Sequence, residues 1–156
     1  MDFLWQEVTG GKDVVIDLVK VLLAFVIAIP VGWERHVSDR NLGLRTFPIV
    51  AIGACGFILL TEEFANGDPD AIARALNGVI TGVGFIGGGA ILKGHGSVRG
   101  LSTAASIWCM GAIGAAVALE RLVVAVTIML ITFTIMRSLA PLVESGKVRS
   151  DAEGEE

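Results

Sequence analysis

Residues 14–33 read VVIDLVKVLLAFVIAIPVGW, a continuous apolar stretch in which only Asp17 and Lys20 are charged. A helix needs about 20 predominantly apolar residues to cross the hydrocarbon core of a bilayer. Asp17 and Lys20 are three positions apart, so they share a helical face and can pair there. The stretch therefore predicts a membrane-spanning helix whose charges lie near its start.

The composition of the whole chain also indicates a membrane protein. Of the 156 residues, 53% are hydrophobic and only 18% are charged, and the mean hydropathy is +0.72. Soluble domains are usually less apolar than this. The net charge of −4 and the lack of a basic patch with interleaved aromatic residues argue against a nucleic-acid partner. Cys55 and Cys109 lie in apolar runs without metal-ligand spacing, so we interpret them as small buried hydrophobes.

Four further segments are apolar enough, or nearly so, to cross the membrane: residues 46–61, 72–92, 102–119 and 122–142. With residues 14–33 they predict an all-α, multi-pass bundle of five transmembrane helices, forming a single domain over residues 1–143. Residues 144–156 are charged and contain glycine, which is typical of a disordered tail.

The basic residues of the loops predict the orientation of this bundle. Eight of the twelve Lys and Arg residues fall on one side of the predicted membrane: Arg35, Arg40, Arg45, Lys93, Arg99, Arg137, Lys147 and Arg149. Loops rich in Lys and Arg remain in the cytoplasm. We therefore expect the N-terminus outside, and the C-terminus with its tail in the cytoplasm.

Residues 78–89, GVITGVGFIGGG, contain the spacing G-x-G-x-x-G from Gly82 to Gly87. This spacing occurs in dinucleotide-binding loops, where a strand precedes the glycines and a helix opens on them. Here the preceding residues belong to an apolar helix. The residue spacing therefore matches the dinucleotide-binding motif, but its predicted structural context does not. We expect no nucleotide or other cofactor.

Two interpretations of these glycines remain open. Small residues four positions apart let membrane helices approach closely, and the helix predicted at 102–119 is also rich in Gly and Ala. Alternatively, the run Gly87–Gly89 breaks the helix near its cytoplasmic end and opens backbone carbonyls toward a site. The glycines concerned are Gly78, Gly82, Gly84, Gly87, Gly88 and Gly89.

Polar residues gather at the predicted cytoplasmic ends of three helices: Glu34, Arg35, Arg45, Thr46, Arg99 and Thr103. A carboxylate at the C-terminal end of a helix is disfavoured by the helix dipole. Glu34 therefore needs a cationic partner, and Arg45 and Arg99 are the candidates. Two helix N-termini and several arginines in one place also favour an anion. We expect a shared ion-pair network that is a candidate functional site, although ordinary interfacial loop charges are the alternative.

Four stretches, in this order, resemble the signature of the MgtC/SapB family: GWER at 32–35, LGLRT at 42–46, GVITGVGFIGGG at 78–89 and VRGLSTAASIW at 98–108. The family more often has Ala at position 42, Ala at position 88 and Thr at position 102. The resemblance implies a multi-pass protein of the bacterial inner membrane, linked to growth in low magnesium and, in pathogens, to survival inside host cells. It also implies that the matched members of the polar cluster matter for function.

The resemblance implies action on other membrane machinery, including the proton-driven ATP synthase. We therefore expect a regulator that works through protein–protein contacts with other membrane proteins or with a second copy of itself. The alternative is a transporter or channel for magnesium or another small ion. A cation pathway needs oxygen ligands along it, and the predicted spans offer only Asp17 near the outer end of the first span and Glu34 immediately after its inner end. The apolar segments hold no Ser/His pair, paired aspartates or zinc spacing, so we expect no enzyme, no catalytic residue and no metal site.

Overall fold

The computed structural model describes the backbone of residues 12–38, 43–65, 67–94 and 97–153, and the side chains of residues 14–35, 43–65, 67–93 and 98–138. Its elements are α2 (Lys12–Ser38), α3 (Thr46–Ala65), α4 (Pro69–Gly89), β1 (Leu92–Gly94), β2 (Ser97–Arg99), α5 (Leu101–Ala118) and α6 (Leu122–Glu153). Four helices, α2 to α5, are long and apolar enough to cross a membrane, and the apolar part of α6, Leu122–Ser138, is shorter. The prediction of an all-α membrane bundle is confirmed.

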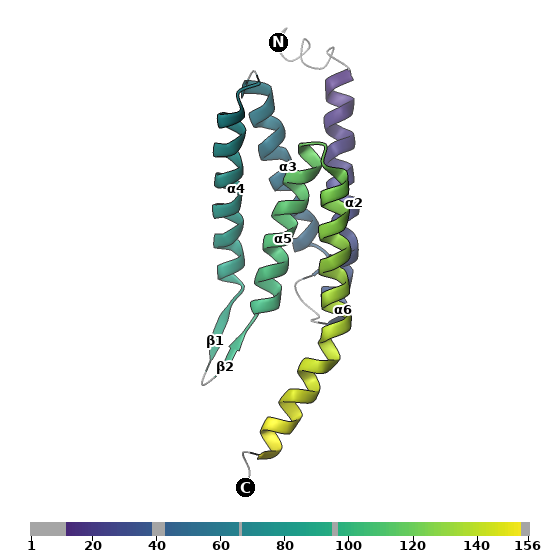
Figure 1. Cartoon of the computed structure of the whole chain (residues 1–156), viewed down its shortest axis with the longest axis vertical. Helices are drawn as coiled ribbons and strands as arrows, with labels where there is room; N and C mark the ends of the chain where they lie inside the picture. Colours follow the sequence, from purple (N-terminus) through teal and green to yellow (C-terminus); the bar gives the residue numbers. More distant parts are fainter. Residues whose placement is uncertain (1–11, 39–42, 66, 95–96, 154–156) are drawn as a thin grey trace.

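The helices lie side by side, so that the chain alternates between the two ends of the bundle (Figure 1). One end of the bundle holds the end of α2, the start of α3, the two strands and the point at which α6 extends beyond the other helices. We call this the basic end, after Arg35, Arg45, Lys93, Arg99 and Arg137. The α3–α4 and α5–α6 turns lie at the other end. We call that the acidic end, after Glu62, Glu63, Asp68, Asp70 and Glu120. Which end faces the cytoplasm stays a prediction.

The centre of the bundle is α5, which contacts α2, α3, α4 and α6. It can lie close to its neighbours because two of its glycines leave room for them. A Cβ added to Gly114 would lie 2.1 Å from the carbonyl oxygen of Ala51 on α3, and one added to Gly111 would lie 2.9 Å from a methyl group of Val83 on α4. The largest fully buried side chains, Phe47, Ile58, Met110 and Ile113 among them, fill the space around it.

The helix predicted at 72–92 is wrong at its end, because α4 stops at Gly89 and Leu92 begins a strand. Strands β1 and β2 form an antiparallel pair that joins α4 to α5. Three successive glycines favour ending a helix because glycine has the highest backbone entropy to lose. The amide of Ala90 donates to the carbonyl of Gly87 at 3.0 Å, which closes a tight last turn. The glycines therefore end α4 and do not interrupt it.

Other helix ends also differ from the prediction. Helix α3 continues past residue 61 to Ala65, since Glu62 and Glu63 are good helix formers. Helix α6 remains helical to Glu153, where a disordered tail was expected from residue 144. The side chains beyond Ser138 lie outside the described residues. The boundary between the domain and a tail therefore stays a prediction.

Candidate functional site

Glu34 lies near the C-terminal end of α2 and is buried, with 7% of its surface exposed. Its partner is Arg137 on α6, whose Nη1 lies 3.5 Å from the Glu34 Oε2. The prediction that Arg45 or Arg99 pairs with Glu34 is therefore wrong. Helix α6 runs beside α2 in the same direction (Figure 1). Arg137 therefore lies level with the end of α2, where it reaches Glu34. A buried carboxylate needs such a cation, because an unpaired charge is costly to remove from water.

The next residue, Arg35, points to a different helix. Its Nη2 donates a hydrogen bond to the Oγ1 of Thr103, a residue of the first turn of α5 that is only 4% exposed. A charged donor makes such a bond stronger than one between neutral groups. The structure thus brings Glu34, Arg35 and Thr103 together from two of the predicted stretches, and α6 adds Arg137.

The other three residues of the predicted cluster do not join this contact. Arg45 is exposed just before α3, Thr46 is half-buried at the first position of α3, and Arg99 is exposed on β2. Among the described side chains, neither Arg45 nor Arg99 forms an ion pair. Arg99 does not reach Glu34, because residues 97–99 form a strand that projects from the helices, whereas the sequence placed Arg99 in a loop.

The predicted cluster leaves out two neighbours of this region, the buried Ser106 and the half-buried Met136. The Ser106 hydroxyl donates to the Ser102 carbonyl at 2.7 Å, and it lies 3.2 Å from the Met136 sulfur on α6. Sequence reasoning also missed Arg137 as a partner, although the residue ends the fifth apolar segment at the same membrane side as Glu34. Their position at the same side of the predicted membrane was the observation that could have suggested the pair. It does not show which helix α6 packs against.

A second ionic cluster lies at the acidic end, around Lys20 of α2. The Lys20 Nζ is 3.1 Å from the Glu120 Oε1 and 3.9 Å from the Glu62 Oε2, and the lysine side chain is only 14% exposed. These partners replace Asp17, with which the sequence predicted a pair on α2 itself. Glu120 sits in the α5–α6 turn with φ 59, a backbone conformation uncommon for residues other than glycine.

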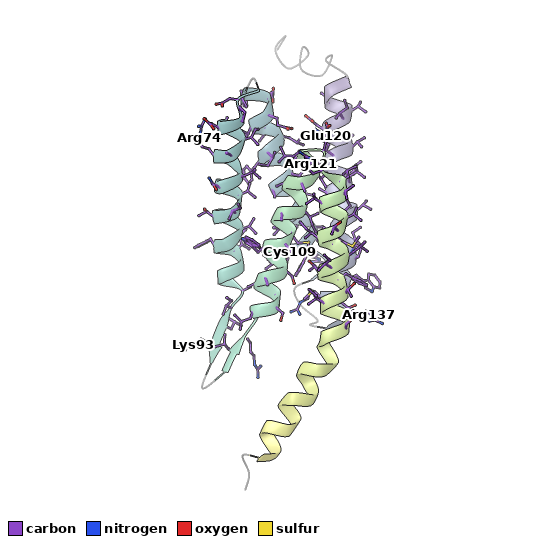
Figure 2. The ribbon with its side chains drawn as sticks, viewed as in Figure 1. Arg74, Lys93, Cys109, Glu120, Arg121 and Arg137 are labelled. Carbon is purple, nitrogen blue, oxygen red and sulfur yellow. The ribbon has the colours of Figure 1, made fainter. Side chains whose placement is uncertain are left out.

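Helices α2 and α6 are therefore held together by an ion pair near each end. Lys20 meets Glu120 just before α6 begins, and Glu34 meets Arg137 far along it; Figure 2 shows Glu120 and Arg137 at these two positions. The sign of the charge on α2 differs between the two pairs. This pattern favours the observed direction of α6 and its register along α2.

The glycines of α4 mostly face open space. A Cβ added to Gly87 would lie 3.1 Å from the carbonyl oxygen of Ala104 on α5, but one added at the other five predicted positions meets nothing within 4 Å. Gly78 and Gly82 instead line an open groove of about 610 Å³ between α3 and α4, together with Gly53 and Phe57 of α3. Among the described glycines, the closest approaches between helices inside the chain are at two glycines of α5, Gly111 and Gly114.

The arrangement of these stretches can now be compared with known proteins. The model of the MgtC family matches residues 21–145, which include all four stretches and Arg137. The chain belongs to the MgtC family. It is 33% identical over 139 residues to protein MgtC of Salmonella paratyphi A, covering 87% of this chain and 59% of that protein. It is 33% identical over 132 residues to protein MgtC of Brucella abortus, covering 83% and 55%.

An uncharacterized protein of Synechocystis is 40% identical over 97 residues, which cover 62% of this chain and 41% of that protein. The chain thus spans less than two thirds of the length of these relatives. No solved structure matches it. Membership of the MgtC family and the four long apolar helices make it a multi-pass membrane protein.

Proposed function

We propose that this chain is a non-catalytic regulator of the bacterial inner membrane that contacts other membrane proteins. Membership of the MgtC family supports a role related to magnesium homeostasis. In this proposal, helices of the chain contact helices of other membrane proteins. Through these contacts the chain regulates proteins that handle magnesium or serve membrane energetics. The proton-driven ATP synthase is the first partner to test, and a second copy of the chain is the next.

The observation that carries the proposal is the outward placement of the glycines on α4. Within a helix, glycine costs about 1 kcal/mol relative to alanine, and lipid chains gain nothing from the missing side chain. A neighbouring helix does gain, because its backbone can come closer. A Cβ added to Gly78 or Gly82 would meet no atom of this chain within 4 Å, and both glycines line the groove between α3 and α4. We therefore place the partner helix in that groove.

The distribution of buried polar groups favours a regulator over a transporter. Among the described residues, the buried polar or charged side chains are Glu34, Thr103 and Ser106, all within about two turns of the basic end. A cation pathway needs successive oxygen ligands across the whole membrane. In the same part of the chain, no three His, Cys, Asp or Glu side chains gather to hold a metal ion.

Photo-crosslinking in living bacteria tests the proposed groove. A photoreactive residue replaces Phe57, which is 65% exposed and lines the groove, and the control replaces Val123, which is 81% exposed on α6 and does not line it. We expect the probe at position 57 to give discrete protein adducts, one of them an ATP synthase subunit. Gly82→Ile should abolish them, because the added side chain projects into the groove from a position where a Cβ meets nothing within 4 Å.

The control at position 123 should give lipid adducts only. An adduct pattern at position 57 that matches the one at position 123, or that Gly82→Ile leaves unchanged, would contradict the groove as a contact site. An adduct of twice the mass of the chain identifies the partner as a second copy.

A further inference from the structure

The β1–β2 hairpin carries apolar and basic side chains outside the helical part of the bundle. It projects beyond α4 and α5 at the basic end, where Figure 2 labels Lys93. The register pairs Leu92 with Arg99 and Lys93 with Val98. Residues directly opposite in an antiparallel pair share one face, so each face of the hairpin combines one apolar with one basic side chain. Leu92 is 68% exposed and Val98 52% exposed.

A glycine holds this hairpin close to the end of α4. Gly100 has φ +87, and a Cβ there would lie 2.1 Å from the carbonyl oxygen of Ala90. Only glycine fits both the left-handed backbone and this approach. The apolar spans of α4 and α5 finish at Gly89 and begin at Leu101. The hairpin therefore lies just outside the hydrocarbon core, at the depth of the lipid headgroups.

The charge at this depth is positive. Arg35, Arg45, Lys93, Arg99 and Arg137 lie at the basic end, and the one described carboxylate there, Glu34, pairs with Arg137. Lys93 and Arg99 are exposed, and neither forms an ion pair with any carboxylate that the structure describes. A surface that exposes apolar side chains beside cations suits the boundary between acyl chains and headgroups, where the apolar groups are buried and the cations reach outward.

We propose that the hairpin is an interfacial anchor in which Lys93 and Arg99 bind the phosphate of anionic phospholipid headgroups while Leu92 and Val98 contact the upper acyl chains. Basic residues next to a membrane span attract anionic lipid. Arg99 belongs to one of the four stretches that mark the family, yet it takes no part in the Glu34 contact. The proposal gives it a role that does not depend on the protein partner of the α3–α4 groove.

Native mass spectrometry of the purified full chain tests this proposal. The protein is released from micelles that contain equal amounts of phosphatidylglycerol and phosphatidylcholine, and the retained lipids are counted. We expect the wild type to prefer phosphatidylglycerol. The double variant K93Q/R99Q should weaken this retention by about fivefold for each cation removed, whereas K93R/R99K should keep it.

The matched control is R74Q/R121Q, which removes the same charge from exposed residues at the acidic end. It should retain phosphatidylglycerol as the wild type does. Equal loss in both double variants, or no preference in the wild type, would overturn the proposal. Displacement of the lipid by soluble glycerol phosphate would also overturn it, because the site would then bind a free anion. Circular dichroism of each variant shows that the helices are intact.

Discussion

The single residue that most changes the interpretation of the polar cluster is Arg137. It supplies the cation that the sequence sought from Arg45 or Arg99, and the paired Glu34 side chain is 9% exposed. Arg137 itself is 68% exposed, so part of its charge is screened by its surroundings. Removing it leaves a buried carboxylate without its partner.

We therefore predict that Arg137→Gln lowers the free energy of unfolding by about 1–3 kcal/mol. Arg45→Gln and Arg99→Gln, at exposed positions, should change it by no more than about 0.5 kcal/mol. Denaturant titration in detergent, followed by circular dichroism, measures all three. An Arg99→Gln effect as large as that of Arg137→Gln would contradict the assignment of the pair.

Glycines make a second residue-scale contrast, between α5 and α4. At Gly114 the added Cβ would lie 2.1 Å from the Ala51 carbonyl oxygen, whereas at Gly82 it meets nothing. We predict that Gly114→Ala destabilises the chain by about 1–3 kcal/mol or more through overpacking. Gly82→Ala should be neutral or stabilising by up to about 1 kcal/mol, because alanine favours the helix. The same titration compares them, and a larger loss for Gly82→Ala would be inconsistent with the packing described.

The residue types of the site could be predicted, but their pairing could not. The sequence placed Glu34 and Thr103 in one polar cluster, because both lie at helix ends on the same side of the predicted membrane. The choice between Arg45, Arg99 and Arg137 depends on which helix packs beside α2. Packing across the bundle decides which helix lies beside α2, and no residue spacing in the sequence indicates that packing. Likewise, a row of glycines shows that something packs closely, but not whether it belongs to the same chain.

At the scale of the elements, the pairing of α2 with α6 depends on charge at both ends. Between the two ion pairs, Ala24 and Ala28 on α2 and Ala125 on α6 are fully buried. Alanines pack closely but define the register of two parallel helices only weakly, because they look alike at each turn. The pairs Lys20–Glu120 and Glu34–Arg137 add polar contacts that favour the observed register.

A double-mutant cycle on Lys20→Met and Glu120→Gln tests the first of these pairs. Their atoms are 3.1 Å apart, but Glu120 is 75% exposed, so we predict a coupling energy of about 0.5–1 kcal/mol. The matched control pairs Lys20→Met with Glu63→Gln, since Glu63 is exposed one residue from Glu62 and forms no ion pair among the described residues. Its coupling should be near zero. Equal coupling in both cycles would mean a general charge effect and no specific pair.

Sequence predicted the helices better than the hairpin for a physical reason. A membrane span needs a long apolar run, which is visible in any window of the sequence. Strands β1 and β2 have three residues each, too few for an alternating pattern to stand out. They form where Gly100 lies against Ala90 at the tight end of α4. Only the folded chain brings these residues together.

For the whole molecule, the bundle separates its polar groups from its centre. Ion pairs lie toward both ends, α5 fills the middle with apolar and small side chains, and the open groove faces the surroundings of the bundle. Such an arrangement suits a protein that presents a surface within the membrane. Among the described side chains, no file of oxygen ligands runs from one end of the bundle to the other. The two candidate functions therefore predict different behaviour in a sealed vesicle.

Magnesium flux through the purified chain separates a regulator from a transporter. Vesicles that enclose a magnesium-sensitive dye are prepared with the wild type, with Arg137→Gln and without protein, and a magnesium gradient is applied at neutral pH. If the chain is a regulator and not a transporter, we expect the same slow rate of dye response in all three preparations. A faster response with the wild type that scales with the amount of reconstituted protein would contradict this expectation and assign transport to this chain.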